Sequence, residues 1–363
     1  MWSNCVKSKL YNAPQLLLIV VLCPKKMTHV SENILSSSGG TPLVRLSKMF
    51  PPDRNVYAKL ESANPGGSMK DRSATLIISE LLRTGKIEPG GTIIESSSGN
   101  MAVGLAQACL FYGLKLIVVV DPKLNPHTRK LLLAYRARLE HVAIACADGG
   151  FLAARLHRVG ELLDLVPGSV WSNQYGNPNN PAAYHTLMKE VTHALDMNVD
   201  FLFLATSTCG SLMGCADFIL ENGLGTKLIA VDAEGSILFG GSESKRWIPG
   251  HGSGVPSNFL DRDKIFDVVH VNDADCILGC RGLLQKEAIL AGGSSGALVA
   301  AYQKYFESMP EGAVSVLIFA DRGERYLDTV YSDDWVSEHI DVPSAYGVYD
   351  TVHRTEKKQI LFQ

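Results

Sequence analysis

Residues 64–72 read Asn-Pro-Gly-Gly-Ser-Met-Lys-Asp-Arg, and this run decides how the rest of the chain is interpreted. Pro65 fixes its own φ angle, and Gly66 and Gly67 permit strained backbone angles and close approach of a flat ring to the main chain. Lys70, the single amine of the run, is therefore suited to hold an aldehyde cofactor as a Schiff base. The alternative is a surface charge cluster at the start of a helix.

The composition is that of an ordinary globular protein. The 363 residues are 46% hydrophobic and 20% charged, which is enough for two modest domains that share a cleft. The formal net charge of −3 gives no basic field for nucleic acid or a membrane surface, so we expect small-molecule substrates and no partner of either kind. The eight cysteines are scattered without zinc-binding spacing, so we expect no metal and a reducing, cytoplasmic location.

The two ends of the chain are set apart from the fold. Residues 1–33 are interpreted as an N-terminal extension, disordered or non-native, with Met27 as a candidate start. The apolar run at 16–23 is too short to span a bilayer and lacks the cleavage site of a signal peptide. Residues 336–363 are interpreted as a C-terminal tail, and its end, 360–363, resembles the remnant of an expression-tag protease site.

Apolar runs rich in Val and Ile alternate with helical patterns along the chain. Near-continuous apolar strands between helices are typical of parallel sheets covered on both faces. Strands are predicted at 56–60, 92–95, 115–120, 141–144, 201–205, 227–231 and 314–319, and helices at 73–84, 101–112, 126–137 and 151–165. Two sheets fit better than one, because the run at 176–181 breaks the pattern and marks a crossing between domains.

Two motifs place hydroxyl groups where a predicted strand gives way to a helix. The first reads Glu95, Ser96, Ser97, Ser98, Gly99 and Asn100. The second reads Ser207, Thr208, Cys209, Gly210 and Ser211. Hydroxyls and free backbone N–H groups at a helix N-terminus form an anion site, although each motif alone is also compatible with a helix cap that binds nothing.

Two glycine-containing runs follow later in the chain. Gly292-Gly293-Ser294-Ser295-Gly296 opens the last long helical pattern, and Gly323-Glu324-Arg325-Tyr326-Leu327 follows the strand at 314–319. We expect Arg325 to bind a carboxylate or carbonyl groups in the core. In this order, and over roughly residues 38–335, the motifs resemble those of the cysteine synthase-like enzymes, which are pyridoxal-phosphate enzymes of fold type II.

The resemblance implies an α/β fold with two parallel-sheet lobes and pyridoxal 5'-phosphate in the cleft between them. The large, cofactor-binding lobe is expected at 34–57 and 168–335, and the small lobe, which binds the substrate carboxylate, at 58–167. It also implies a homodimer.

The resemblance assigns roles to the motifs. Lys70 carries the cofactor and removes the substrate α-proton, Asn100 binds the ring oxygen, and Ser294 faces the pyridine nitrogen. A hydroxyl at that nitrogen favours loss of a β-leaving group over transamination or racemisation. The cofactor phosphate is assigned to Ser207, Thr208, Cys209, Gly210 and Ser211, and the substrate carboxylate to Ser96, Ser97, Ser98 and Gly99. Cys209 departs from the glycine of the family's phosphate cup and limits close backbone approach there.

One subgroup of the family is a closer match, through the runs at 121–123, 149–151, 173–175 and 326–333. Its members join O-phospho-L-serine to L-glutamate through an aminoacrylate intermediate, in 2,3-diaminopropionate biosynthesis for siderophores. By this resemblance Arg155 meets the substrate phosphate, and Gln174 and Tyr175 line the substrate pocket. The residues alone leave Arg155 equally open to being a solvated charge on its helix.

Two other functions remain open at this point. A cysteine synthase would use O-acetylserine or O-phosphoserine with sulfide, and it needs only a small pocket for the nucleophile. A glutamate acceptor needs two carboxylate sites instead. An inactive binding subunit of a synthase complex is the third reading, and the presence of Lys70, Asn100 and Ser294 argues against it.

Overall fold

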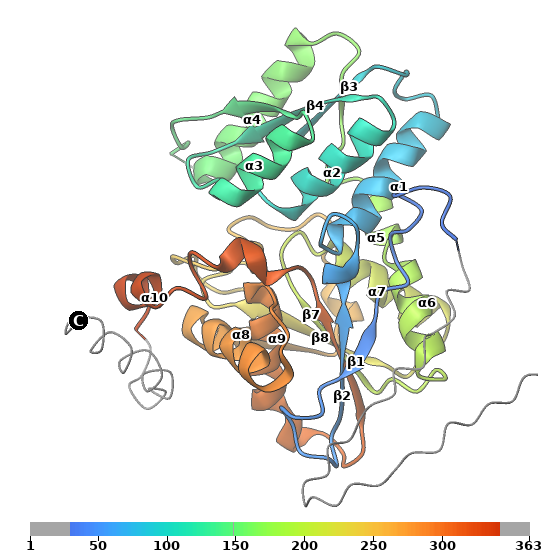
Figure 1. Ribbon diagram of the computed structural model, residues 1–363, viewed down its shortest axis with the longest axis vertical. Coiled ribbons are helices and arrows are strands. Elements are labelled where there is room, and N and C mark those ends of the chain that lie inside the picture. The colour runs from blue at the N-terminus through green and yellow to red at the C-terminus, as the bar shows by residue number, and fades with distance from the viewer. Residues whose placement is uncertain (1–29, 148, 342–363) are drawn as a thin grey trace, which may run out of the picture.

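The computed structural model describes residues 30–147 and 149–341. They form two α/β lobes, one above the other in Figure 1, each with its own mostly parallel sheet. The predicted two-lobed α/β fold is therefore confirmed. The predictions for 1–29 and 342–363, which include Met27, the apolar run at 16–23 and the last four residues, lie outside the described residues. No helix in the described ranges is long and apolar enough to cross a membrane.

The larger sheet has six strands in the order β1-β2-β10-β7-β8-β9, and all neighbours pair in parallel except β1 with β2. Its strands are β1 (Leu43–Arg45), β2 (Asn55–Leu60), β7 (Phe201–Ala205), β8 (Lys227–Ala233), β9 (Asp267–Val271) and β10 (Val314–Phe319). Side chains alternate between the two faces along each strand, and both faces of this sheet are apolar because helices cover them. In β7, Phe201 and Phe203 enter one core cluster, and Leu202 and Leu204 enter the other.

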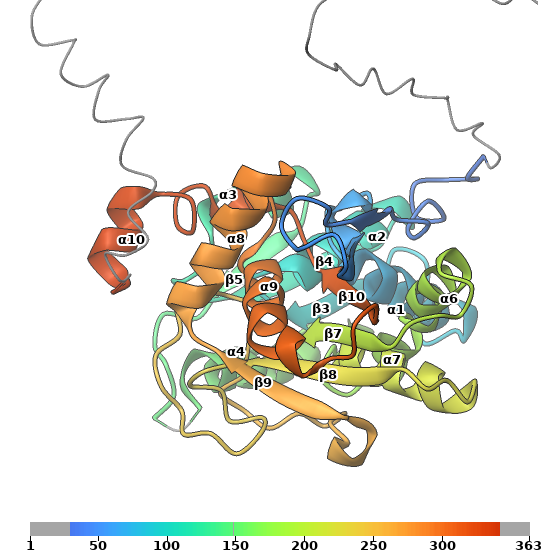
Figure 2. The ribbon, with the colours of Figure 1, turned by 90° about the horizontal axis from the view of Figure 1, so that it is seen from below.

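Helices cover both faces of this sheet. One side packs on α8 (Asp273–Glu287) and α9 (Gly293–Tyr305), and the other on α6 (His185–Ala194) and α7 (Gly210–Glu221) (Figure 1). Figure 2 shows α10 (Asp333–His339) on the side of α8, away from α6. The remaining short elements of this lobe are α5 (Asn179–Ala182), η2 (Arg262–Lys264), η3 (Phe306–Ser308) and η4 (Gly323–Tyr326), and η1 (Glu61–Ala63) directly follows β2.

The smaller sheet has four parallel strands in the order β5-β4-β3-β6. They are β3 (Thr92–Ser96), β4 (Lys115–Val120), β5 (Arg138–His141) and β6 (Val170–Trp171). One face packs on α1 (Lys70–Arg83), α2 (Asn100–Phe111) and α3 (Pro126–Ala134), and the other on α4 (Gly150–Leu165).

Most predicted elements are confirmed, and one strand is wrong. The fourth predicted strand, at 141–144, lies at Arg138–His141 instead, paired with β4. The apolar run after it misled the prediction, since Ile144 is 83% exposed and belongs to no strand. β5 is an edge strand with polar side chains, so it lacks the apolar signal of a central strand. β1, β6 and β9 were not predicted, because they are short or half-buried.

The strand pairings suggest lobe limits that differ slightly from the predicted ones. β2 lies in the six-stranded sheet, although the small lobe was predicted to begin at residue 58. β6 lies in the four-stranded sheet, although that lobe was predicted to end at residue 167. Helix α10 also continues past residue 336, where the tail was predicted to begin. We therefore propose a small lobe from about residue 61 to about residue 172 and a core that reaches residue 339.

Helix α1 connects the two lobes. Its buried side chains at Ala74, Ile77, Ile78 and Leu81 pack in the core of the small lobe. Met69, one residue before the helix, packs in the core of the large lobe. The start of α1 is therefore held at the junction of the lobes.

Buried charges fix that junction. Arg72, in the first turn of α1, donates to Glu61 at 2.7 and 2.9 Å and to Glu190 of α6 at 2.7 and 2.8 Å. Lys59 of β2 lies 2.5 Å from Glu190 and donates to the carbonyl of Thr41 at 2.6 Å. Burial alone would raise the pKa of Glu190, but the bonds from Arg72 lower it to about 2. We call Lys59, Glu61, Arg72 and Glu190 the junction charges.

We predict that Arg72→Ala lowers the free energy of unfolding by about 3–5 kcal/mol, because Glu61 loses its buried ion-pair partner and Glu190 keeps only Lys59. Urea unfolding followed by circular dichroism measures this. The matched control is Arg83→Ala in the last turn of the same helix, where the pair with Glu80 is exposed and little change is expected. Equal losses in the two variants would contradict a special role for the junction charges.

Candidate active site

Lys70 is the first residue of α1 and lies at the junction of the lobes. It is partly buried, and its Nζ is 3.5 Å from the hydroxyl of Tyr184 and 5.7 Å from the centre of that ring. The preceding turn requires glycine: Gly67 has a φ of +86°, and a Cβ on Gly66 would lie 2.6 Å from Oδ1 of Asp71. The amine lies against the hydroxyl and ring of Tyr184.

The serine loop lies at the start of α2. Ser96 ends β3 and Asn100 begins α2, so Ser97, Ser98 and Gly99 sit at the N-terminus of a helix of 12 residues. Ser96 is fully buried, and its Oγ has no hydrogen-bond partner within the described part of the chain. An unpartnered buried hydroxyl beside a helix N-terminus suits an anion such as a carboxylate.

Glu95 anchors this loop. Its buried carboxylate accepts hydrogen bonds from the Ser96 N–H (2.7 Å), the Ser172 hydroxyl (2.7 Å) and the Gln174 N–H (3.1 Å). Burial raises the pKa of Glu95, and the bond from Ser172 acts against that rise. Gln174 also donates its side-chain amide to the Ser96 carbonyl at 2.9 Å. Gln174 therefore holds the loop, and its predicted contact with substrate stays a prediction.

Arg155 of α4 lies beside the same loop. Its side chain is only 11% exposed, with Nε 3.4 Å from Oδ2 of Asp121 and Nη1 3.4 Å from the Ser98 hydroxyl. The alternative of a solvated helix charge is therefore wrong. Burial and the nearby charge of Glu95 raise the pKa of Tyr175 to about 12, and the charge of Arg155 acts against that rise. The structure thus brings together five predicted substrate residues: Ser96, Ser98, Arg155, Gln174 and Tyr175.

The predicted phosphate cup lies at the start of α7, also a helix of 12 residues. Thr208 accepts a bond from the Gly210 N–H at 3.4 Å, and its carbonyl accepts one from the Ser257 hydroxyl at 2.8 Å. Cys209 has a φ of 63°, in the left-handed region that favours glycine, so the turn keeps the shape that a glycine would give it. Burial raises the pKa of Cys209 to about 12, and the nearby charge of Lys70 acts against that rise.

Ser294 lies in the first turn of α9 and is 7% exposed. Ser295 beside it is fully buried, and within the described ranges its Oγ has no hydrogen-bond partner. The preceding Gly292 donates its N–H to the carbonyl of Asp321 at 3.2 Å. This helix start therefore presents hydroxyl groups, and it is attached to the end of β10.

Asp321, which the sequence analysis missed, lies between the motifs. It follows β10, is 2% exposed, and accepts bonds at Oδ2 from the Asn100 amide and the Tyr326 hydroxyl, both at 2.8 Å. Arg325 donates to Oδ1 of Asn100 and to the carbonyl of Gly66, which confirms the expectation that it binds a carbonyl group. A charged residue at the carboxyl end of a parallel strand was the available signal. Tyr184 gave no signal, because buried tyrosines are common in cores.

The groups around Lys70 fit an aldehyde cofactor that carries a phosphate. Lys70 supplies the amine, the start of α7 supplies hydroxyls and N–H groups for the phosphate, and Asn100 and Ser294 supply neutral polar groups for a ring. The charge of Lys70 acts to lower the pKa of both Cys209 and Asp321, against the effect of burial. The cup and the Asn100 network therefore lie near the same amine. The unpartnered hydroxyls of Ser96 and Ser295 leave hydrogen-bonding capacity for ligands.

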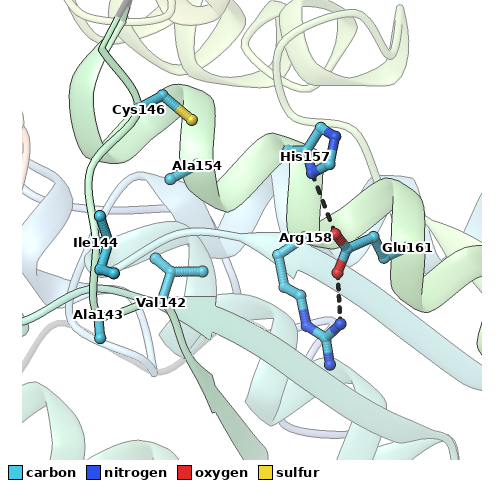
Figure 3. Close-up of a pocket in the computed structure, with 8 residues that line it drawn as sticks. All are labelled: Val142, Ala143, Ile144, Cys146, Ala154, His157, Arg158 and Glu161. Carbon is cyan, nitrogen blue, oxygen red and sulfur yellow. Dashed lines mark hydrogen bonds and ion pairs between the residues drawn. The ribbon is translucent and has the colours of Figure 1, made fainter.

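A separate groove of about 320 Å³, which we call the outer groove, lies between α4 and the segment that follows β5 (Figure 3). Its lining includes Arg158, His157 and Glu161 of α4, and none of the predicted site residues. Arg158 pairs there with Glu161 at 2.5 Å and with Glu140 at 2.6 Å. Arg155 and Arg158, three residues apart on one helix, therefore have different surroundings: one faces the serine loop and the other the outer groove.

Comparisons with known proteins agree with this geometry. A family model described as "Pyridoxal-phosphate dependent enzyme" matches residues 34–321. The chain is 44% identical over 310 residues to an N-(2-amino-2-carboxyethyl)-L-glutamate synthase from Ralstonia nicotianae, with 85% of this chain and 92% of that protein covered.

Solved structures show the same fold. An O-acetylserine dependent cystathionine beta-synthase from Helicobacter pylori is 33% identical with a TM-score of 0.77, covering 84% of this chain and 100% of that one. A cysteine synthase from Entamoeba histolytica is 29% identical with a TM-score of 0.78, covering 90% and 94%. The similarity therefore extends over both lobes.

The Lys70 turn also generates a prediction about pH. Asp71 is 1% exposed and accepts the Gly66 N–H at 2.5 Å; burial raises its pKa from 3.8 to about 6, against that bond. Between pH 4 and 6 the unfolded chain loses this proton and the folded chain retains it, so stability falls as pH rises.

We expect the free energy of unfolding of Asp71→Asn, relative to that of the wild type, to rise by about 1.4 kcal/mol per pH unit between pH 4 and 6. Above pH 6 it should rise no further. Urea unfolding at half-unit pH steps measures the difference. Asp53→Asn, at an exposed carboxyl, is the control variant and is measured in the same way. If the difference in unfolding free energy between Asp71→Asn and the wild type does not change with pH, this carboxyl ionises normally in the folded protein.

Proposed function

The chain belongs to the family of pyridoxal-phosphate dependent enzymes, and we propose that it replaces the phosphate of O-phospho-L-serine with the amine of L-glutamate. The reaction breaks the bond between Cβ and the phosphate oxygen, forms a bond between Cβ and the glutamate nitrogen, and releases phosphate. The product would be N-(2-amino-2-carboxyethyl)-L-glutamate, which contains a 2,3-diaminopropionate unit. The 44% identity to a synthase named for that product supports the proposal.

The observation that carries the choice of donor is the setting of Arg155. Its guanidinium is largely buried, 3.4 Å from the Ser98 hydroxyl, beside the loop proposed to bind the substrate carboxylate. O-phosphoserine brings a carboxylate and a phosphate, and a planar fork of donors suits the phosphate. O-acetylserine has no charge on its leaving group and would leave this buried cation without an anionic partner other than Asp121.

The proposed roles are those that the family resemblance implies, and the contacts described above support them. When bound, pyridoxal phosphate supplies an electron sink that makes the Cα proton of the donor acidic. Lys70 would hold the cofactor and then take that proton, and Asn100 and Ser294 would face the ring. The phosphate group of the cofactor is proposed to lie among Ser207, Thr208, Cys209, Gly210 and Ser211, and the substrate carboxylate among Ser96, Ser97, Ser98 and Gly99.

A cysteine synthase is the second candidate, and the similarity to the Entamoeba histolytica enzyme favours it. It differs from the proposal in its nucleophile, which is sulfide rather than an amino acid, and in a donor that need not carry phosphate. The homodimeric state and the place in siderophore biosynthesis, both implied by the resemblance, and the cytoplasmic location, expected from the cysteines, are also part of the proposal.

The test offers the purified enzyme O-phosphoserine or O-acetylserine as donor, each with glutamate, aspartate or sulfide, and identifies products by mass spectrometry. The proposal predicts the glutamate adduct from O-phosphoserine as the main product. Cysteine formed more efficiently from O-acetylserine and sulfide would move the chain to the second candidate.

In the same assay we predict that Arg155→Ala lowers kcat/KM for O-phosphoserine by about ten- to a hundredfold, through loss of charge-assisted bonds to phosphate. Any activity with O-acetylserine should change little. Arg158→Ala is the matched control on the same helix, because Arg158 lines the outer groove, and both donors should react as in the wild type. Equal losses for the two donors in Arg155→Ala would make Arg155 a structural residue.

A further inference from the structure

The side chain of Asn100 is held at both ends by charged groups. At one end its Nδ2 donates to Oδ2 of Asp321 at 2.8 Å. At the other end Arg325 donates through Nη1 to Oδ1 of Asn100. Asn100 is the first residue of α2, whereas Asp321 and Arg325 follow β10, so the contacts join the two lobes across the site.

These contacts select one orientation of the amide. The oxygen and nitrogen ends of an asparagine amide have nearly the same shape, and a flip exchanges them. A carboxylate only accepts hydrogen bonds and a guanidinium only donates them. With Nδ2 toward Asp321 and Oδ1 toward Arg325 both partners are satisfied, whereas a flipped amide would oppose like groups at both ends. The second N–H of Nδ2 remains to donate to a further acceptor.

Asp321 and Arg325 are themselves fixed by the other motifs of the site. The hydroxyl of Tyr326 donates to the same Oδ2 of Asp321 at 2.8 Å. A Cβ on Gly292 would lie 1.9 Å from Oδ1 of Asp321, so the loop before Ser294 packs directly on this carboxylate. Arg325 donates through Nη2 to the carbonyl of Gly66 at 3.0 Å, in the run that contains Lys70.

We propose that Asp321 and Arg325 are positioning residues, which orient the Asn100 amide so that its free N–H points to an acceptor on the ring of the bound cofactor. This inference rests on the proposed cofactor site, in which Asn100 faces the ring oxygen. It assigns a function to a carboxylate that is buried and has an unpartnered Oδ1 within the described ranges. Asp321 and Arg325 act through Asn100 and need not touch the substrate.

A double-mutant cycle on cofactor affinity tests this. The holoenzyme is dialysed, and free and bound pyridoxal phosphate are measured for the wild type, Asn100→Ala, Asp321→Asn and the double variant. We expect Asp321→Asn to weaken binding roughly tenfold, or about 1.4 kcal/mol. Because Asp321 acts through Asn100, the double variant should bind no more weakly than Asn100→Ala alone.

Two further variants separate orientation from stability. Tyr326→Phe removes the other donor to Asp321 but leaves the bond to Asn100, so the loss of cofactor affinity should be smaller than in Asp321→Asn, while urea stability falls. Arg325→Gln runs the same cycle with Asn100→Ala from the opposite end of the amide, and it replaces Asp321→Asn if that variant does not fold. The same lack of additivity is expected.

Three results would overturn the inference. The first is that the losses of cofactor affinity in the single variants multiply in the double variants. The others are a cofactor affinity unchanged in both Asp321→Asn and Arg325→Gln, or unchanged in Asn100→Ala. The proposed function is judged separately, by the product that the wild type forms from O-phosphoserine and glutamate. If the product forms but the losses of cofactor affinity in the single variants multiply in the double variant, only the positioning role is rejected. If the product does not form, but the double variant binds the cofactor no more weakly than Asn100→Ala, the proposed reaction is rejected and the positioning role stands.

Discussion

The four junction charges are the constraint on which the rest of the site depends. Lys59, Glu61 and Arg72 are almost fully buried, and Glu190 joins them from α6. Removing charges from water is costly, so such a set is stable only when every member keeps its partner in good geometry. This requirement leaves little freedom in how the start of α1 meets β2 and α6. Lys70, two residues before Arg72, is therefore placed by the large lobe although the body of its helix packs in the small one.

Each sheet adds a buried carboxylate at the carboxyl end of one of its inner strands. Glu95 in β3 ties the serine loop to Gln174, and Asp321 after β10 ties Asn100 to the start of α9. Open parallel sheets form their binding sites at this end of the strands. The two carboxylates fix helix starts and amides rather than facing solvent, so the polar groups offered to ligands are mainly hydroxyls, amides and backbone N–H groups. Such groups suit the anionic ends of a phosphorylated cofactor and an amino acid.

The sequence was most informative where a physical requirement leaves few residue types. Central parallel strands must be apolar on both faces, and β2, β3, β4, β7, β8 and β10 were predicted for that reason. The edge strand β5 was missed, because its side chains are mostly polar and none of them is fully buried. Tyr184 could not be assigned to the site, because its role depends on a contact with a residue more than a hundred positions away. Asp321 had a signal in its place after β10, but its partner Asn100 is also more than a hundred positions away. The burial of Arg155 also depended on a distant residue, Asp121.

The central claim is that the junction charges hold Lys70 as the amine that carries the cofactor. The most direct test is reduction of the holoenzyme with borohydride, which converts the link between amine and cofactor into a stable bond, followed by proteolysis and mass spectrometry. The account predicts that the modified peptide contains residues 64–72 and that the added mass lies on Lys70. Cofactor mass on any other lysine, with Lys70 unmodified, would contradict it.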